Sequence, residues 1–113
     1  MEGLIRREPE YIEALQILGD AYTRRGKFLD GLGVDERLAR MCPDDAIVHY
    51  NLACSFSLTD QCEEGIHALE RALNLGYRDF KWLVEDPDLK NLRRHTLFRK
   101  IRAKVRSLRV RAR

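Results

Sequence analysis

The stretch LGDAY at residues 18–22 recurs 34 residues later as LACSF at residues 52–56. Both stretches place a leucine, a small residue and an aromatic residue at the same spacing. The same offset relates Gly31-Leu32 to Gly65-Ile66. Self-similarity at a fixed period of roughly 20–50 residues is typical of proteins built from stacked units. The chain of 113 residues therefore holds two full units and the end of a third.

The first unit has the pattern of two helices. Leu15, Leu18 and Tyr22 recur at spacings of three and four residues, as expected for one face of a helix. Gly26 follows this run and can adopt the left-handed conformation that ends a helix. A second apolar run covers residues 29–41, which predicts an antiparallel partner helix.

The second unit repeats the arrangement. We predict helices over residues 46–58 and 63–75, separated by a turn near residue 60. Asp45 offers a carboxylate to cap the first of these helices, and Gly76 ends the second. Small residues should allow the helices of each pair to approach closely, and they are Gly19, Gly31, Ala53 and Gly65.

The C-terminal part begins with a short helix. Pro87 cannot lie inside a helix without losing a hydrogen bond, so we predict a helix over residues 78–85 and a turn over residues 86–88. A last helix should cover residues 96–108, with one apolar stripe and one basic face, as a terminal cap requires. The apolar stripe consists of Leu97, Phe98, Ile101, Val105 and Leu108.

These features resemble the tetratricopeptide repeat, whose motif reads W-x2-L-G-x2-Y, then A-x3-F, then P. The second unit matches it loosely, with His49 in place of the tryptophan and Tyr77 in place of the proline. The first unit departs from the motif at Gly31 and Asp35, where alanine and an aromatic residue are usual. It matches the motif at Leu18, Gly19, Tyr22 and Pro43.

The resemblance implies an all-α, TPR-like superhelix of antiparallel helix hairpins. The expected parts are the second helix of a preceding repeat, two repeats, a short helix with a DPDL turn, and a basic capping helix with its tail. Their ranges are 1–9, 10–43, 44–77, 78–94 and 95–113. The N-terminal methionine falls in the middle of an expected helix. We therefore expect either a fragment of a longer array or self-association through the exposed N-terminal repeat face.

The resemblance also implies a function as a protein–protein interaction scaffold. Repeats of this kind line a concave surface with the first helix of each pair, and this surface commonly binds a peptide. Among the groove positions, Gln16 and Asn51 suit hydrogen bonds to a peptide backbone, and Tyr50 suits an amphipathic anchor. The predicted groove residues are Glu13, Gln16, Asp20, Thr23, Arg24, Ile47, Tyr50, Asn51, Cys54 and Leu58.

One subclass of these repeats grips a C-terminal carboxylate with lysine and asparagine side chains. Asn51 occupies one such position. Gln16 and Asp20 occupy positions where that subclass needs lysine and asparagine. Because Asp20 would repel a carboxylate, we do not expect this chain to bind one.

Charge is distributed unevenly along the chain. Residues 1–92 hold 11 basic and 18 acidic side chains, whereas residues 93–113 hold 10 basic and no acidic ones. A basic segment of this kind offers an alternative function, as an electrostatic adaptor for nucleic acid or an anionic membrane surface. The basic patch on the last helix would consist of Arg99, Lys100, Arg102, Lys104, Arg106 and Arg109.

No pattern in the sequence indicates an enzyme, a cofactor or a metal. His49, His67 and His95 stand apart from one another and from any nucleophile motif. The three cysteines form neither an even set nor a C-x-x-C pair, so we expect reduced thiols and a cytoplasmic location. No apolar run approaches the roughly 18 residues of a membrane span.

Overall fold

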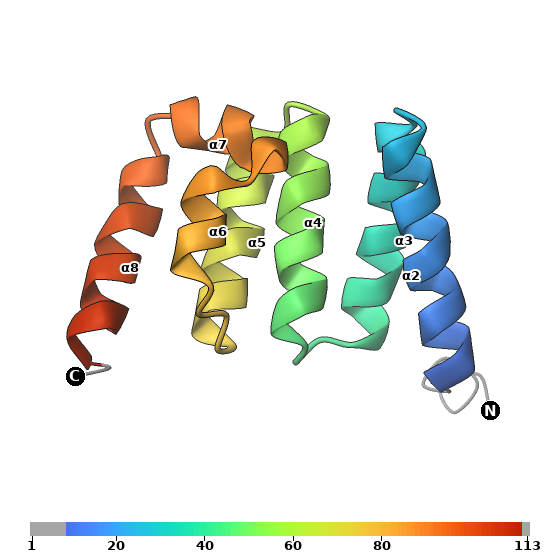
Figure 1. Cartoon of the computed structure of the whole chain (residues 1–113), viewed down its shortest axis with the longest axis horizontal. Coiled ribbons are helices and arrows are strands. Elements are labelled where there is room, and N and C mark those ends of the chain that lie inside the picture. Colours follow the sequence, from blue (N-terminus) through green and yellow to red (C-terminus); the bar gives the residue numbers. More distant parts are fainter. Residues whose placement is uncertain (1–8, 112–113) are drawn as a thin grey trace.

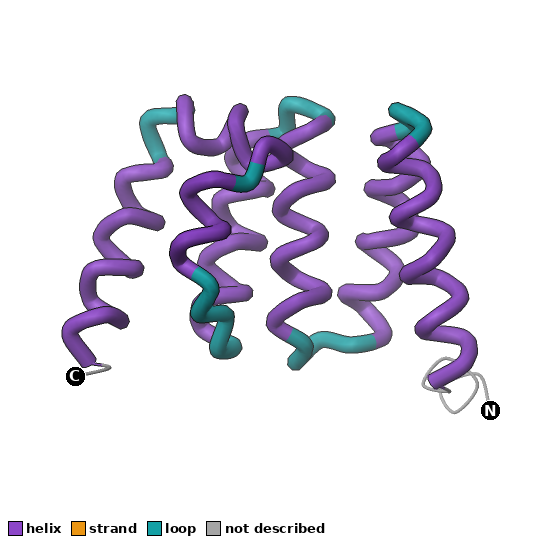
Figure 2. Tube along the Cα trace, viewed as in Figure 1, coloured by secondary structure: helices purple, strands orange, loops and turns teal. Residues whose placement is uncertain are grey.

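The computed structural model describes residues 9–111, and all regular secondary structure in this range is helical (Figures 1 and 2). The long helices lie side by side along the long axis of a molecule that measures 42 × 31 × 20 Å. The all-α prediction is therefore confirmed for these residues. In chain order the helices are α2 (Pro9–Arg24), α3 (Phe28–Met41), α4 (Ala46–Leu58), α5 (Cys62–Asn74), α6 (Phe80–Glu85), the 3-10 helix η1 (Pro87–Leu89), α7 (Lys90–Arg94) and α8 (Phe98–Arg111).

Local capping explains where several helices begin and end. Asp45 precedes α4, and its carboxylate accepts hydrogen bonds from the backbone N–H groups of Ile47 and Val48 at 2.9 and 3.2 Å. Asp79 caps α6 in the same way. Gly26 follows α2 with φ of 75°, and Gly76 lies just after α5 with φ of 113°. Asp45, Gly26 and Gly76 were predicted in these roles from the sequence, whereas the cap at Asp79 was not.

The C-terminal segment differs in detail from the prediction. Helix α6 begins at Phe80 because Asp79 caps it, so residues 78–79 remain outside the helix. Of the expected turn at residues 86–88, Asp86 caps η1 and residues 87–88 lie within it, where Pro87 is the first residue and needs no hydrogen-bonded N–H. The short helix α7 follows directly and was not predicted. Helix α8 begins at Phe98 and continues to Arg111, beyond the predicted end.

The predicted residue 1–9 segment, the second helix of a preceding repeat, lies outside the described residues except for Pro9. Pro9 itself is the first residue of α2.

The small residues lie where elements approach closely, as predicted. A Cβ atom added to Gly65 would lie 2.7 Å from Cδ2 of Leu92 and 3.3 Å from Cβ of Phe56. Ala53 is fully buried. Gly65 therefore sets the distance of α5 from α7 as well as from its hairpin partner α4.

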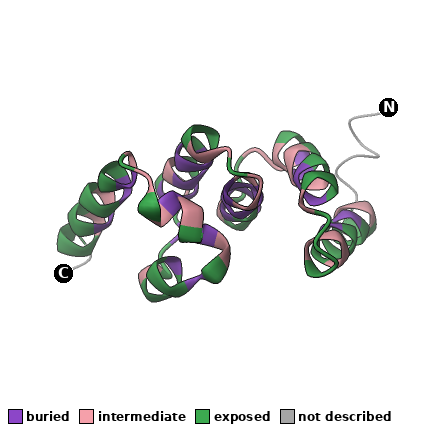
Figure 3. Ribbon diagram, turned by 90° about the horizontal axis from the view of Figure 1, so that it is seen from above, coloured by how far each residue is buried: buried purple, intermediate pink, exposed green. Residues whose placement is uncertain are grey.

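Two apolar clusters form the core. The larger one joins α4 and α5 to α7 and α8, and α8 contributes Phe98, Ile101 and Val105 to it. The burial pattern in Figure 3 shows α8 with its buried side turned inward and its exposed side outward. The smaller cluster lies between α2, α3 and α4 and consists of Leu15, Leu38, Met41 and Val48.

One predicted core residue is exposed. Leu18 was expected on the apolar face of α2 with Leu15, but 41% of its surface is exposed, whereas Leu15 is buried. Ile17 on α2 and Leu29 on α3 are also exposed, at 60% and 73%. Gly19 takes the buried position beside Leu15, because α3 approaches closely there. Self-association through the exposed residues remains a prediction.

A pair of glycine substitutions tests the close approach at Gly65. Gly65→Ala should lower the free energy of unfolding by about 1–3 kcal/mol, because the buried Leu92 has little room to move. Gly33→Ala is the control, since nothing lies within 4 Å of a Cβ atom there. This change should stabilise the exposed face of α3 by about 0.5–1 kcal/mol. Urea unfolding measures both, and equal effects would contradict the packing argument.

Candidate functional site

A cleft of about 370 Å³ opens between α2, α4 and the segment that joins α6 to η1. Seven of the ten predicted groove residues line it, whereas Glu13, Gln16 and Ile47 do not. Its lining residues come from α2, α3, α4, α6 and the Asp86 turn. They are Gly19, Asp20, Thr23, Arg24, Asp35, Tyr50, Asn51, Cys54, Ser55, Leu58, Trp82, Asp86 and Asp88.

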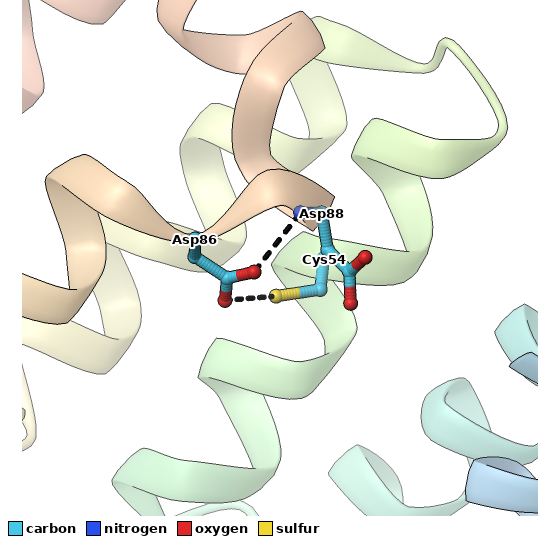
Figure 4. A group of neighbouring side chains, drawn as sticks. All are labelled: Cys54, Asp86 and Asp88. Atoms are coloured by element: carbon cyan, nitrogen blue, oxygen red, sulfur yellow. Dashed lines mark hydrogen bonds between the residues drawn. The ribbon is translucent and has the colours of Figure 1, made fainter. Parts of the chain in front are cut away.

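Asp86 forms the buried corner of this cleft. Its Oδ2 atom accepts a 2.6 Å hydrogen bond from the hydroxyl of Tyr50 and a 3.7 Å one from the thiol of Cys54. Its Oδ1 atom accepts a 2.9 Å bond from the backbone N–H of Asp88 (Figure 4). Only 4% of Asp86 is exposed. One carboxylate thus ties the start of η1 to the middle of α4.

Tyr50 supports the cleft from within the core. Its ring stacks on Tyr77 with the centroids 4.3 Å apart and the planes 7° from parallel. The residue is buried, and its hydroxyl donates to Asp86. Burial, and then the bond to Asp86, raise the pKa of Tyr50, so it stays a neutral donor. Tyr50 was expected to contact a bound peptide, but most of its side chain packs within the core of this chain. Only part of the side chain reaches the cleft.

Cys54, Asp86 and Asp88 are the described residues grouped closely enough to hold a metal ion, since their ligand atoms lie within 4.8 Å of one another. Burial raises the pKa of the Cys54 thiol, and the neighbouring carboxylates of Asp86 and Asp88 raise it further. A metal ligand must be a thiolate, whereas this thiol donates a hydrogen bond to Asp86 in the structure. Figure 4 shows the three residues close together, with hydrogen bonds from the Cys54 thiol and from the backbone N–H of Asp88 to the Asp86 carboxylate. The donor set therefore fits a hydrogen-bond network better than a metal site.

Asp35 is the second unusual carboxylate of the cleft. It extends from α3 and accepts a hydrogen bond from the hydroxyl of Ser55 on α4. Its pKa is raised from 3.8 to about 6, because burial and, to a smaller extent, the nearby charge of Asp20 raise it by more than the bond from Ser55 lowers it. Ionisation of Asp35 at neutral pH therefore lowers the stability of the folded chain.

The cleft has an acidic lining. Four aspartates face it from three sides, and Arg24 is the one basic side chain among the lining residues. Within residues 9–111, none of the four carboxylates forms an ion pair with a lysine or arginine side chain. The cleft therefore carries a net negative charge that the described part of the chain does not neutralise.

Several lining residues were absent from the predicted groove. Trp82, Asp86 and Asp88 were missed because the prediction used only the first helix of each pair, and the chain folds its later segment back onto α4. Asp35 was noted only as a departure from an aromatic motif position. That departure was the available signal, because a carboxylate at a packing position needs an explanation.

The predicted basic patch lies on α8. Five of its six residues are exposed, and Lys104 is half-buried. The guanidinium groups of Arg102 and Arg109 lie over the rings of Phe98 and Phe80, with carbon-to-centroid distances of 4.9 and 5.4 Å. None of the six lines the cleft. Contact of this face with nucleic acid or a membrane surface remains a prediction.

Comparison with known proteins finds a relative in a plant. Over 96 residues the chain is 37% identical to a chloroplastic protein of Arabidopsis thaliana. The match covers 82% of this chain and 27% of that protein, so the chain spans about a quarter of the relative's length. No family model matches the chain, and no solved structure matches it significantly.

The comparison leaves the location of this chain open. The word chloroplastic belongs to the relative's name, and the cytoplasmic location expected from the cysteines remains a prediction. None of the helices within residues 9–111 is long and apolar enough to cross a bilayer.

Removal of the Asp86 carboxylate should destabilise the chain. Asp86→Ala deletes a charge-assisted hydrogen bond and leaves the Tyr50 hydroxyl buried without its partner, which costs about 2–4 kcal/mol. Asp44→Ala, at an exposed position, should stay within about 0.5 kcal/mol of the parent. Denaturant unfolding measures both. In the Asp86→Ala background, Tyr50→Phe should recover stability, and a further loss there would contradict the pairing.

Asp35→Asn should make the chain more stable at neutral pH. The folded state keeps a proton on Asp35 up to about pH 6 and the unfolded chain only to about pH 4, so ionisation lowers the free energy of unfolding across that window. The variant should gain about 1–3 kcal/mol at pH 7 and little at pH 4. Asp30→Asn, at an exposed position of the same helix, is the control. Thermal unfolding at both pH values measures the difference, and a pH-independent gain would contradict the assignment.

Proposed function

We propose that this chain is a protein-interaction module of the tetratricopeptide repeat class, which binds an extended segment of a partner protein in the cleft between α2, α4 and Trp82. The observation that carries the proposal is the cleft itself, which gathers side chains from five segments of the chain on one side of the molecule. Seven of its lining residues coincide with groove positions expected from the repeat pattern.

The turns of the two helix pairs support the assignment to this class. Gly26 lies in the turn after α2 with φ of 75°, and Asp60, 34 residues later, lies in the turn after α4 with φ of 57°. A positive φ is uncommon for a residue other than glycine. The same left-handed backbone conformation at the same offset supports two units of one design, in addition to the matching residues of the sequence.

The character of the lining supports binding over catalysis. The cleft mixes polar and apolar side chains, and Asn51 is an exposed lining residue whose amide offers both donors and an acceptor. The buried thiol of Cys54 is protonated and therefore a poor nucleophile. An exposed amide beside apolar side chains is suited to hold the backbone of an extended peptide.

A library of random ten-residue peptides, displayed and selected on the full chain, tests the proposal. Asn51→Ala should weaken the selected peptides at least about fivefold, because a hydrogen bond worth roughly 1 kcal/mol is lost. Asn74→Ala on α5 removes the same side chain at an exposed position outside the cleft and should leave their affinity unchanged. Selection that yields no peptide sensitive to Asn51→Ala would count against the function.

A further inference from the structure

The carboxylates of the cleft come from three directions. Asp20 extends from α2, Asp35 from α3, and Asp86 with Asp88 from the segment after α6. Arg24 is their one basic neighbour in the lining, and no ion pair joins any of them to another side chain within the described residues. Carboxylates from three separate elements thus face the same cleft. Their mutual repulsion is unfavourable unless a cation enters the cleft.

Trp82 adds an aromatic surface to the same cleft. It is the single tryptophan of the chain, and 45% of its surface is exposed, whereas its helix neighbour Leu83 is buried. An indole face is the best aromatic partner for a guanidinium or ammonium group. A cation in the cleft would therefore find a carboxylate and an aromatic ring together.

The cleft is large enough to receive one or two long side chains of a partner segment, since its volume is about 370 Å³.

Resting on the function proposed above, we propose that the cleft selects an extended partner segment through an arginine or lysine side chain, which the carboxylates of Asp20 and Asp35 receive beside Trp82. The complementary charge identifies the occupant. An acidic segment or a free C-terminal carboxylate would instead meet four aspartates. The acidic lining would repel a carboxylate, so the cleft is not suited to bind one.

Asp35 gives this assignment a second support. Burial raises its pKa, so the free chain is destabilised when the group ionises. The groups that act on it are Asp20 from α2, with Ser55 and the Cys54 thiol from α4, and Arg24 from α2 lines the same cleft. A partner cation would offset the unfavourable charge, which explains why a costly carboxylate occupies a packing position.

Calorimetric titration of the full chain with two blocked peptides tests the proposal. One carries two arginines in a Gly-Ser background, and the other carries citrulline, a neutral isostere, at the same places. The arginine peptide should bind at least tenfold tighter and change the fluorescence of Trp82. Its affinity should rise severalfold between pH 5 and pH 7 as Asp35 ionises, because the cation favours the ionised form.

Matched variants separate the cleft from general surface charge. Asp35→Asn should weaken the arginine peptide at least fivefold while the variant folds more stably than the parent. Asp30→Asn makes the same charge change on the same helix, outside the cleft, and should alter affinity less than twofold. Equal effects of the two variants, or equal binding of both peptides, would overturn the proposal.

The remaining outcomes separate this inference from the proposed function. Library peptides that depend on Asn51 but lack enrichment in arginine and lysine would leave the function standing and overturn the cation selectivity. Concentration-dependent assembly that Asp35→Asn abolishes, measured by sedimentation, would assign the cleft to the basic α8 of a second copy. That result would overturn the assignment to a partner segment.

Discussion

The bond from the Tyr50 hydroxyl to the Asp86 carboxylate is the interaction on which the C-terminal half depends. It joins residues 36 positions apart and lies in a buried setting where an unpaired charge is costly. Because Asp86 also caps η1, the direction of the chain after α6 follows from the same carboxylate. That direction returns the chain over α4 and α5, so that Leu89 and Leu92 are fully buried before α8 begins. The cleft exists because this return places Asp86 and Asp88 beside α4.

How well each part of the fold could be predicted depends on whether the residues that determine it lie close together in the sequence. Caps are local, so Asp45 and Gly76 indicated helix ends correctly, and α4 has the predicted bounds. Helix α7 was missed because its five residues form no periodic pattern and its stability comes from Leu92 packing near Gly65. Leu18 was assigned to the core by periodicity alone, which shows that a side chain lies on a face without showing what covers that face.

The site was predicted in part for a similar reason. The lining residues on α2 and α4 were predicted because the expected repeat pattern placed these two helices along one surface. Asp86 reaches the same cleft through a long-range bond to Tyr50, and Trp82 lies on the helix just before it, so no local pattern encodes these positions. Tyr50 was predicted to be an amphipathic anchor for a peptide. The side chain is amphipathic, but its hydroxyl donates a hydrogen bond to Asp86. Asp35 was the one lining residue that the sequence marked as unusual without revealing its surroundings.

The two faces of α8 have a consequence for protein engineering. Phe98, Ile101 and Val105 cover α5, while most of the exposed residues of the helix are basic. A further helix pair added after residue 111 would therefore find little apolar surface on which to stack. Lengthening the helical stack by design would therefore require insertion between α5 and α6, with residues 80–111 kept as the C-terminal segment. The last inserted helix pair would have to provide a glycine equivalent to Gly65, which leaves room for Leu92, and a tyrosine equivalent to Tyr50, which donates to Asp86.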